Sequence, residues 1–404
     1  MNIKRIFKVF SIIVYSFIFI GSSQIILAQA DQAQWEWGSK SDARIGSGIG
    51  PRGNVPVQVS DLTDMSAVAG GVFHSLGLKN DGTVLAWGWN YYGQLGNGTD
   101  GPFNSNIQVP VHVLNLADVT AVAGGYWHSL ALRNDGTVWA WGFNGDGELG
   151  NGTNAGSNVP VQVMNLTGVI AISGGYFHSL ALKNDGTVWA WGWNAYGELG
   201  NGVNTHSNVP VQVSNLTDVT AVAGGYWHSL ALRNDGTVWA WGYNEGGELG
   251  NGTNADSNVP VQVSNLTGVT AVAGGVYHSL ALKNDGTVWA WGYNYYGQLG
   301  NGTNGHGANS NVPVQASNLT GVTAISGGYF HSLALKNDGT VWAWGENPNG
   351  NLGDGTNTVS NVPVHAHNLT DVISIAGCYW HSLVLKKDGM VWAWGVLPIP
   401  TQEP

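Results

Sequence analysis

Short apolar runs with alternating character, separated by Gly, Asn and Asp, make up most of the chain. One unit has such runs at residues 209–213, 220–225, 228–232 and 237–242. Runs of this length, rich in Val, Thr and Trp and bounded by turn residues, predict β-strands rather than helices. Each unit is therefore expected to form a four-stranded antiparallel sheet.

This unit recurs seven times, at a spacing of 50 residues or slightly more. Its His-Ser-Leu triplet begins at His74, His128, His178, His228, His278, His331 and His381, and its Trp-Gly pair begins at Trp87, Trp141, Trp191, Trp241, Trp291, Trp344 and Trp394. Alternation along a strand places Trp239 and Trp241 on one side and Val238 and Ala240 on the other. A bulky face can then pack on the small face of the next sheet, which predicts an all-β, seven-bladed β-propeller.

The repeat resembles that of the regulator-of-chromosome-condensation (RCC1) family: a Trp-Gly strand, a Gly-Gln-Leu-Gly-like loop and a Gly-Gly-x-x-His-Ser-Leu-Ala-Leu strand recur from about Trp35 to Gly395. The resemblance implies a seven-bladed ring closed by the N-terminal strand. An extra Trp-Gly copy at residues 35–38 is in register with the others, so we expect it to meet the last unit. Val391–Trp394 carries the same motif, and an incomplete eighth blade is the alternative.

The first 30 residues have a different character from the repeats. Lys4, Arg5 and Lys8 precede an apolar run at residues 9–20, and Ala28-Gln29-Ala30 offers a small-x-small cleavage site. This order predicts a secretory signal peptide at 1–30 and a single mature domain at 31–404. Because the apolar run is shorter than the ~20 residues that span a bilayer, we expect export without a remaining membrane span, with an uncleaved anchor as the alternative.

Charge and composition exclude several classes of function. The chain has 14 Lys and Arg against 25 Asp and Glu; the leader holds three of the basic residues, so the mature net charge is 11 minus 25, or −14. Such a chain would be repelled by the phosphate backbone of a nucleic acid. The single cysteine, Cys378, stands where six sister units have Gly, which predicts a buried, inert thiol.

No linear motif for catalysis or for a cofactor stands out from the repeat, so we expect a protein that has no cofactor and is not an enzyme. We also expect it to be a monomer. The seven equivalent histidines would be spread around the ring, beyond the ~2 Å reach of one zinc ion, and structural hydrogen bonds are expected for them instead. The loop Asn144–Asn154 contains Asp146 and Glu148 but lacks the alternating carboxylates of a calcium loop. The Asn-Gly-Thr and Asn-Leu-Thr triplets are either turn residues or glycosylation acceptors.

Loops alternate between the two ends of an antiparallel sheet, so the Gly-Gly-aromatic loops and the long segments after Trp-Gly should share one end. These segments differ most between units, and exposed loops that differ are typical recognition surfaces of repeat proteins. Asp146, Glu148, Glu198, Glu245 and Glu248 predict an acidic surface there, suited to a basic or amphipathic partner. The candidate partner-binding residues are Phe73, Trp89, Tyr91, Tyr92, Trp127, Phe143, Phe177, Trp193, Trp227, Tyr243, Tyr277, Tyr293, Phe330 and Trp380. Each of these rings could equally fill a gap between blades.

These observations favour a secreted, non-catalytic scaffold that binds a protein. The chain is similar to secreted bacterial β-lactamase-inhibitor proteins of the same repeat type, which implies inhibition of a secreted enzyme, although its loops after Trp-Gly are longer. Guanine-nucleotide exchange on a small GTPase is the activity that the wider family implies. A carbohydrate-binding module is the third alternative, because aromatic platforms with acidic neighbours also suit sugars.

Overall fold

Tight turns at the Asn-Asp-Gly triplets set the pairing of neighbouring strands. Asp235 Oδ1 accepts hydrogen bonds from the backbone N–H and the hydroxyl of Thr237 at 2.9 and 2.6 Å. Gly236 takes a φ of 77°, a conformation that glycine adopts without strain. The turn joins β15 (His228–Arg233) to β16 (Val238–Gly242) as an antiparallel pair in which His228 lies opposite Gly242.

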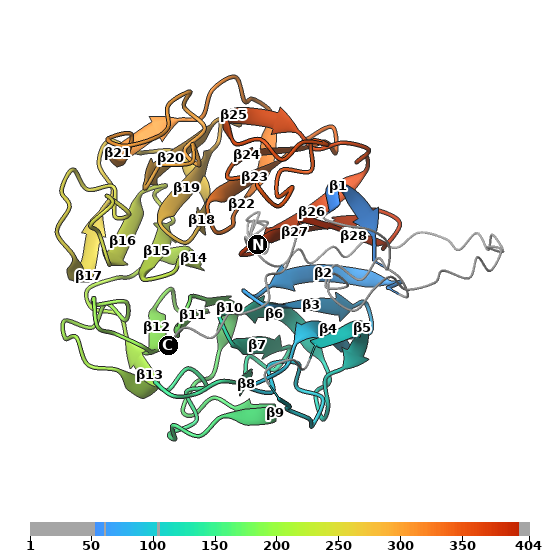
Figure 1. Ribbon diagram of the computed structural model, residues 1–404. Coiled ribbons are helices and arrows are strands. Elements are labelled where there is room, and N and C mark those ends of the chain that lie inside the picture. Colours follow the sequence, from blue (N-terminus) through green and yellow to red (C-terminus); the bar gives the residue numbers. More distant parts are fainter. Residues whose placement is uncertain (1–52, 60–61, 103–105, 396–404) are drawn as a thin grey trace, which may run out of the picture.

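The structure, a computed structural model, describes residues 53–59, 62–102 and 106–395, and over these residues it is a ring of seven four-stranded sheets (Figure 1). The strands of blades 1 to 3 are β2 (Met65–Gly70), β3 (His74–Lys79), β4 (Val84–Trp89) and β5 (Asn106–His112); β6 (Val119–Gly124), β7 (His128–Arg133), β8 (Val138–Gly142) and β9 (Ser157–Gln162); and β10 (Val169–Gly174), β11 (His178–Lys183), β12 (Val188–Gly192) and β13 (Ser207–Gln212). Blade 4 joins β15 and β16 to β14 (Val219–Gly224) and β17 (Ser257–Gln262). Blades 5 and 6 are β18 (Val269–Gly274), β19 (His278–Lys283), β20 (Val288–Gly292) and β21 (Ser310–Gln315); and β22 (Val322–Gly327), β23 (His331–Lys336), β24 (Val341–Gly345) and β25 (Ser360–His365). The all-β, seven-bladed prediction is confirmed.

Each blade takes its outermost strand from the start of the next sequence unit. Residues 209–213 were expected to join the strands that follow them, but β13 pairs with β12, with Trp189 opposite Gln212. The expected grouping is therefore wrong by one strand. The physical reason is that the long loop after Trp-Gly folds back and lets the chain pair with the strand it has just left, whereas the segment after β13 crosses to the next blade.

Blade 7 is completed by the N-terminal strand. It contains β26 (Val372–Gly377), β27 (His381–Lys386), β28 (Val391–Gly395) and β1 (Gly53–Gln58), and β1 pairs antiparallel with β28. Closure by an N-terminal strand is confirmed, but the closing strand is Gly53–Gln58, and the Trp-Gly copy in the blade is that of β28. The expected role of residues 35–38 lies outside the described residues.

The blades pack bulky face on small face. Trp241 is fully buried and packs with Leu180, Ala190 and other residues of blade 3. Val238 and Ala240, on the other side of the same strand, pack with Trp291 of blade 5. The alternation predicted from the sequence thus forms the interfaces between blades, and these interfaces form the core.

Buried hydrogen bonds hold each blade to the next. Trp241 Nε1 and Ser229 Oγ both donate to the carbonyl oxygen of Glu198, at 2.7 and 2.9 Å. Because the serine hydroxyl has donated its only proton, it accepts from Nε2 of His178, 3.0 Å away. Burial lowers the pKa of His178 to about 3, so its imidazole is neutral.

The same His–Ser bond recurs around the ring and ends with His381 and Ser75 at 3.1 Å. The seven histidines are therefore structural, as expected. Among the residues that the structure describes, no three His, Cys, Asp or Glu side chains gather as a metal site would require. The same part of the chain contains no helix long and apolar enough to cross a membrane.

Candidate protein-binding face

The Gly-Gly-aromatic turns and the segments after Trp-Gly meet at one end of the ring. The ring centroids of Trp127 and Phe143, one from each kind of loop, are 5.4 Å apart, and those of Trp227 and Tyr243 are 5.5 Å apart. At the other end, the backbone N–H of Asn234 donates to the carbonyl of Asp218 at 2.9 Å. The predicted sorting of loops is confirmed.

Aromatic side chains form concentric rings at this end, which we call the aromatic face. The innermost ring holds the first residues after Gly-Gly, and the second ring holds their neighbours; these are Val72, Tyr126, Tyr176, Tyr226, Val276, Tyr329 and Tyr379, then Phe73, Trp127, Phe177, Trp227, Tyr277, Phe330 and Trp380. The third ring follows Trp-Gly and includes Trp89, Phe143, Trp193, Tyr243 and Tyr293. Contacts run from blade to blade and close between Phe73 and Tyr379, with centroids 6.3 Å apart.

Two of the predicted binding residues are too buried to present their rings to a partner. Phe73 is 4% exposed and Trp89 is 1% exposed, because both pack in one cluster with Val72 and with half-buried rings of blades 1, 2, 3 and 7. For these two residues the prediction is corrected: they support the face from below. Tyr91 is 37% exposed. The other predicted residues are half-buried and reach the surface: Tyr92, Trp127, Phe143, Phe177, Trp193, Trp227, Tyr243, Tyr277, Tyr293, Phe330 and Trp380.

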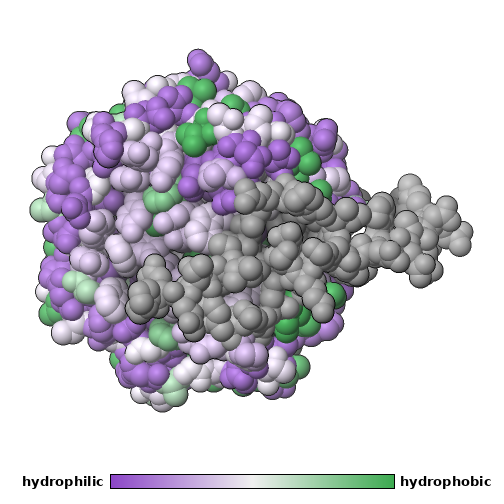
Figure 2. Space-filling view, viewed as in Figure 1, coloured by the Kyte–Doolittle hydropathy of each residue, from purple (hydrophilic) through white to green (hydrophobic). Residues whose placement is uncertain are grey.

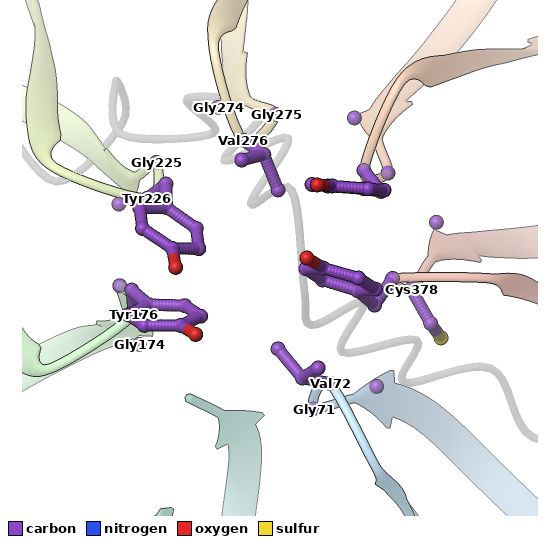
Figure 3. A pocket seen from close by; sticks show the side chains of 18 of the residues that line it. Gly71, Val72, Gly174, Tyr176, Gly225, Tyr226, Gly274, Gly275, Val276 and Cys378 are labelled. Carbon is purple, nitrogen blue, oxygen red and sulfur yellow. The ribbon is translucent and has the colours of Figure 1, made fainter. Parts of the chain in front are cut away.

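The innermost tyrosines were missing from the predicted set, although the repeated Gly-Gly-Tyr signal marks them. They surround a central cavity of about 80 Å³ whose wall also contains the glycine pairs and Cys378 (Figure 3). The hydroxyls of Tyr176 and Tyr226 point toward its centre. Burial raises the pKa of both phenols far above the usual range, so they stay neutral. Cys378 is buried, as expected, and burial raises its thiol pKa well above the ordinary value.

The acidic character predicted for this face is wrong for Glu148, Glu198 and Glu248. Each is at most 1% exposed, and its Oε2 accepts a hydrogen bond from the backbone N–H two residues earlier, at 2.9 to 3.0 Å. Burial raises the pKa of each carboxyl to about 8, so all three are mainly protonated at pH 7. Of the other two predicted acidic residues, Glu245 is exposed and Asp146 is half-buried.

Basic side chains are segregated at the opposite end. All eight Lys and Arg residues of the described ranges either end a His-Ser-Leu strand or, for the last of them, begin the turn that follows; they are Lys79, Arg133, Lys183, Arg233, Lys283, Lys336, Lys386 and Lys387. These side chains interact with residues of their own hairpin. Lys183 Nζ, for example, lies 5.7 Å from the ring centre of Trp189 and 3.6 Å from Oδ2 of Asp185. The aromatic face therefore carries no Lys or Arg among the residues that the structure describes.

The view in Figure 2 shows no aliphatic patch as large as the aromatic face. Figure 2 shows strongly hydrophobic residues in small, separate groups around the ring. Exposed examples such as Val109, Met164 and Ile170 belong to different strands and connections. Scattered residues of this kind are normal for a protein surface.

Comparison with protein families gives matches over most of the chain. The model described as "RCC1-like domain" matches residues 18–275. Two models of the regulator of chromosome condensation (RCC1) repeat match residues 285–335 and 338–385, and residues 269–298 and 322–351.

Curated relatives match over shorter stretches. The human E3 ubiquitin-protein ligase HERC2 is 33% identical over 138 residues, which are 33% of this chain and 3% of HERC2. The ultraviolet-B receptor UVR8 of Arabidopsis thaliana is 31% identical over 133 residues, which are 32% of this chain and 29% of the receptor. The matches thus span only a small part of these relatives.

Solved structures match over nearly the whole length. Human WBSCR16 has a TM-score of 0.73 at 26% identity, covering 85% of this chain and 90% of that one. Prp20p of Saccharomyces cerevisiae has a TM-score of 0.72 at 24% identity, covering 91% of each chain, and its report concerns binding to Gsp1p and histones.

Proposed function

The chain belongs to the family of RCC1-like domains, and from this premise we propose that it is an exported, non-catalytic binding protein that holds a protein partner on its aromatic face. The fold supplies a rigid ring, because neighbouring blades share cores and buried hydrogen bonds. The loops at one end then decide what is recognised.

One observation carries this proposal: half-buried rings form a continuous network on the end of the ring where the sequence units differ. Trp127, Trp227 and Trp380 are locked by their neighbours, and each still reaches the surface. Rigid aromatic side chains contribute contact area at little cost in conformational entropy, and they dominate the binding energy of many protein interfaces.

Two further observations support the proposal. Prp20p, which has the same fold, binds the proteins Gsp1p and histones. Export is supported by the basic, apolar and small-residue order of residues 1–30. Inhibition of a secreted enzyme is one form that binding of a protein could take.

The proposal is tested by affinity capture from the medium in which the native cells grow. Wild-type protein is compared with a W127A/W227A/W380A variant and with a control variant, W139A/W189A/W239A, which removes three half-buried tryptophans from outside the aromatic face. We expect wild type and control to recover the same protein and the first variant to lose it. Equal recovery by all three, or binding of a glycan array without a captured protein, contradicts the proposal.

Export is tested on the same material. Mass spectrometry of the protein in the medium should give a mature N-terminus near Asp31. If the protein is found only inside the cell, the proposed export is wrong. The binding face is then tested by the same capture experiment with cell extract.

A further inference from the structure

Two blades depart from the others in the same two ways. Blades 1 and 5 have Val72 and Val276 at the channel position, where the other five blades have tyrosine. Their loops after Trp-Gly also carry paired tyrosines, Tyr91–Tyr92 and Tyr295–Tyr296, whose ring centroids are 4.7 and 5.0 Å apart. The described loops of the other blades carry no such pair. Blades 1 and 5 lie on opposite sides of the ring, β2 to the right and β18 to the upper left in Figure 1.

The two valines divide the innermost ring into two stacks. Tyr176 packs against Tyr126 and Tyr226 with centroids 3.8 and 3.4 Å apart, and Tyr329 packs against Tyr379 at 3.7 Å. Val72 and Val276 stand at the two gaps between these stacks, as Figure 3 shows for Val276 above and Val72 below the labelled tyrosines. The mouth of the channel therefore has two tyrosine walls, separated by two shorter aliphatic side chains that are 9% and 8% exposed.

This shape defines a line across the face. It begins over Tyr91, which is 37% exposed, passes Val72, the cavity and Val276, and ends over Tyr295, which is 36% exposed. The cavity of about 80 Å³ has room for the end of one side chain, since about 15 Å³ of such space already holds a water molecule. Along this line, hydroxyls of neutral tyrosines face inward and aromatic surfaces lie at both ends.

The charged residues of the aromatic face indicate the charge of a segment that would bind at the channel mouth. The described part of the aromatic face holds no Lys or Arg, whereas its loops after Trp-Gly carry the acidic side chains of Glu245 and Asp256, which are exposed, and of Asp354, which is half-buried. Phenol oxygens accept hydrogen bonds from an ammonium or guanidinium group, and aromatic faces attract cations. An anionic segment would meet no lysine or arginine in the described part of this face.

We propose that the channel mouth is a slot from blade 1 to blade 5 that takes an extended, basic segment of the protein partner, with one lysine or arginine side chain in the central cavity and flanking residues over Tyr91 and Tyr295. This inference rests on the proposed function, because the segment belongs to the partner held on the aromatic face. It adds the location, the extended shape and the charge of the recognised segment.

The first experiment uses a phage-displayed library of random peptides of about 12 residues, which reach about 40 Å when extended. Selection on the wild-type protein should enrich peptides with a lysine or arginine and a net positive charge. The enriched peptide is then synthesised, and its affinity is measured by fluorescence anisotropy. No enrichment, or enrichment of acidic or uncharged peptides, overturns the proposal.

Two variants locate the binding site of that peptide. V72Y/V276Y fills both ends of the slot with the residue that five sister blades already carry, so the fold should tolerate it, and we expect the affinity to fall about tenfold or more. V72A/V276A opens the ends and should bind within about threefold of wild type. Equal binding by V72Y/V276Y overturns the slot.

The same variants separate this inference from the proposed function. If V72Y/V276Y still captures the protein that W127A/W227A/W380A loses, the slot is wrong and the aromatic face remains the binding surface. If V72Y/V276Y and W127A/W227A/W380A each capture the partner protein as well as wild type does, the slot and the proposed function are both wrong.

Discussion

Replacing three buried glutamates by glutamine should make the protein more stable at neutral pH than the wild type. Glu148, Glu198 and Glu248 each use one oxygen to accept a backbone hydrogen bond. Gln94 and Gln298 occupy the same position in blades 1 and 5 and accept the same bond at 3.0 Å. Glutamine therefore fits the site and keeps the bond, and the variant E148Q/E198Q/E248Q removes only the ionisable group.

The magnitude follows from the pKa of these carboxyls. In the unfolded chain they ionise near the ordinary value of 4.5, whereas burial raises the folded-state pKa to about 8. Between these values the folded state keeps a proton that the unfolded state releases, so the free energy of unfolding falls as the pH rises. From pH 4.5 to pH 7 each glutamate can cost up to about 3 kcal/mol, at 1.36 kcal/mol per pH unit.

The assay is chemical and thermal unfolding followed by tryptophan fluorescence at pH 4.5, 6, 7 and 8. Variant and wild type should have similar stability at pH 4.5 and separate progressively up to pH 8, with the variant more stable. The reverse variant Q94E/Q298E should lose stability over the same interval. Parallel pH profiles for wild type and both variants would refute the assignment of these carboxyls as buried and protonated.

Three further outcomes test the packing between blades. Ser279→Ala should lower the free energy of unfolding by about 1–3 kcal/mol in urea titrations, because it leaves Nε2 of His228, now 2.9 Å from the hydroxyl, buried without a partner; an unchanged midpoint would contradict the ring of His–Ser bonds. Gly124→Ala should lower the melting temperature in differential scanning calorimetry, since its Cβ would lie 2.6 Å from the backbone nitrogen of Gly71 in the preceding blade; a variant as stable as wild type would mean that the blades do not approach so closely. Cys378 should react with a thiol reagent only after denaturation, because the residue is only 5% exposed and burial raises the pKa of its thiol; rapid reaction of the native protein would contradict that placement.

The sequence was enough for the repeated architecture because the same alternation occurs in every unit. Val238, Trp239, Ala240 and Trp241 alternate in size, and this places them on the two different interfaces that the structure contains. The assignment of outer strands failed because a repeat has no marked beginning. Only the pairing of β13 with β12 shows where one blade ends.

The candidate site was predicted less completely, for reasons of burial. In a sequence, a glutamate in a polar loop is expected to be a charged surface residue. Only the structure shows that Glu148 is buried and accepts a hydrogen bond from the backbone N–H of Asp146. Likewise, Trp89 differs from Trp193 through the tyrosines and the neighbouring blade that cover it. The ends of the slot required the three-dimensional order of the blades, because Val72 and Val276 are far apart in the chain.

Hydroxyl-radical footprinting of the captured complex tests most directly whether the aromatic face is the binding surface. Trp127, Trp227 and Trp380 should be oxidised in the free protein and protected in the complex, while Trp139 and Trp189, which stack beneath basic side chains near the other end, should react equally in both states. Protection of Trp139 and Trp189 with continued oxidation of the first three would place the partner elsewhere and contradict the assignment.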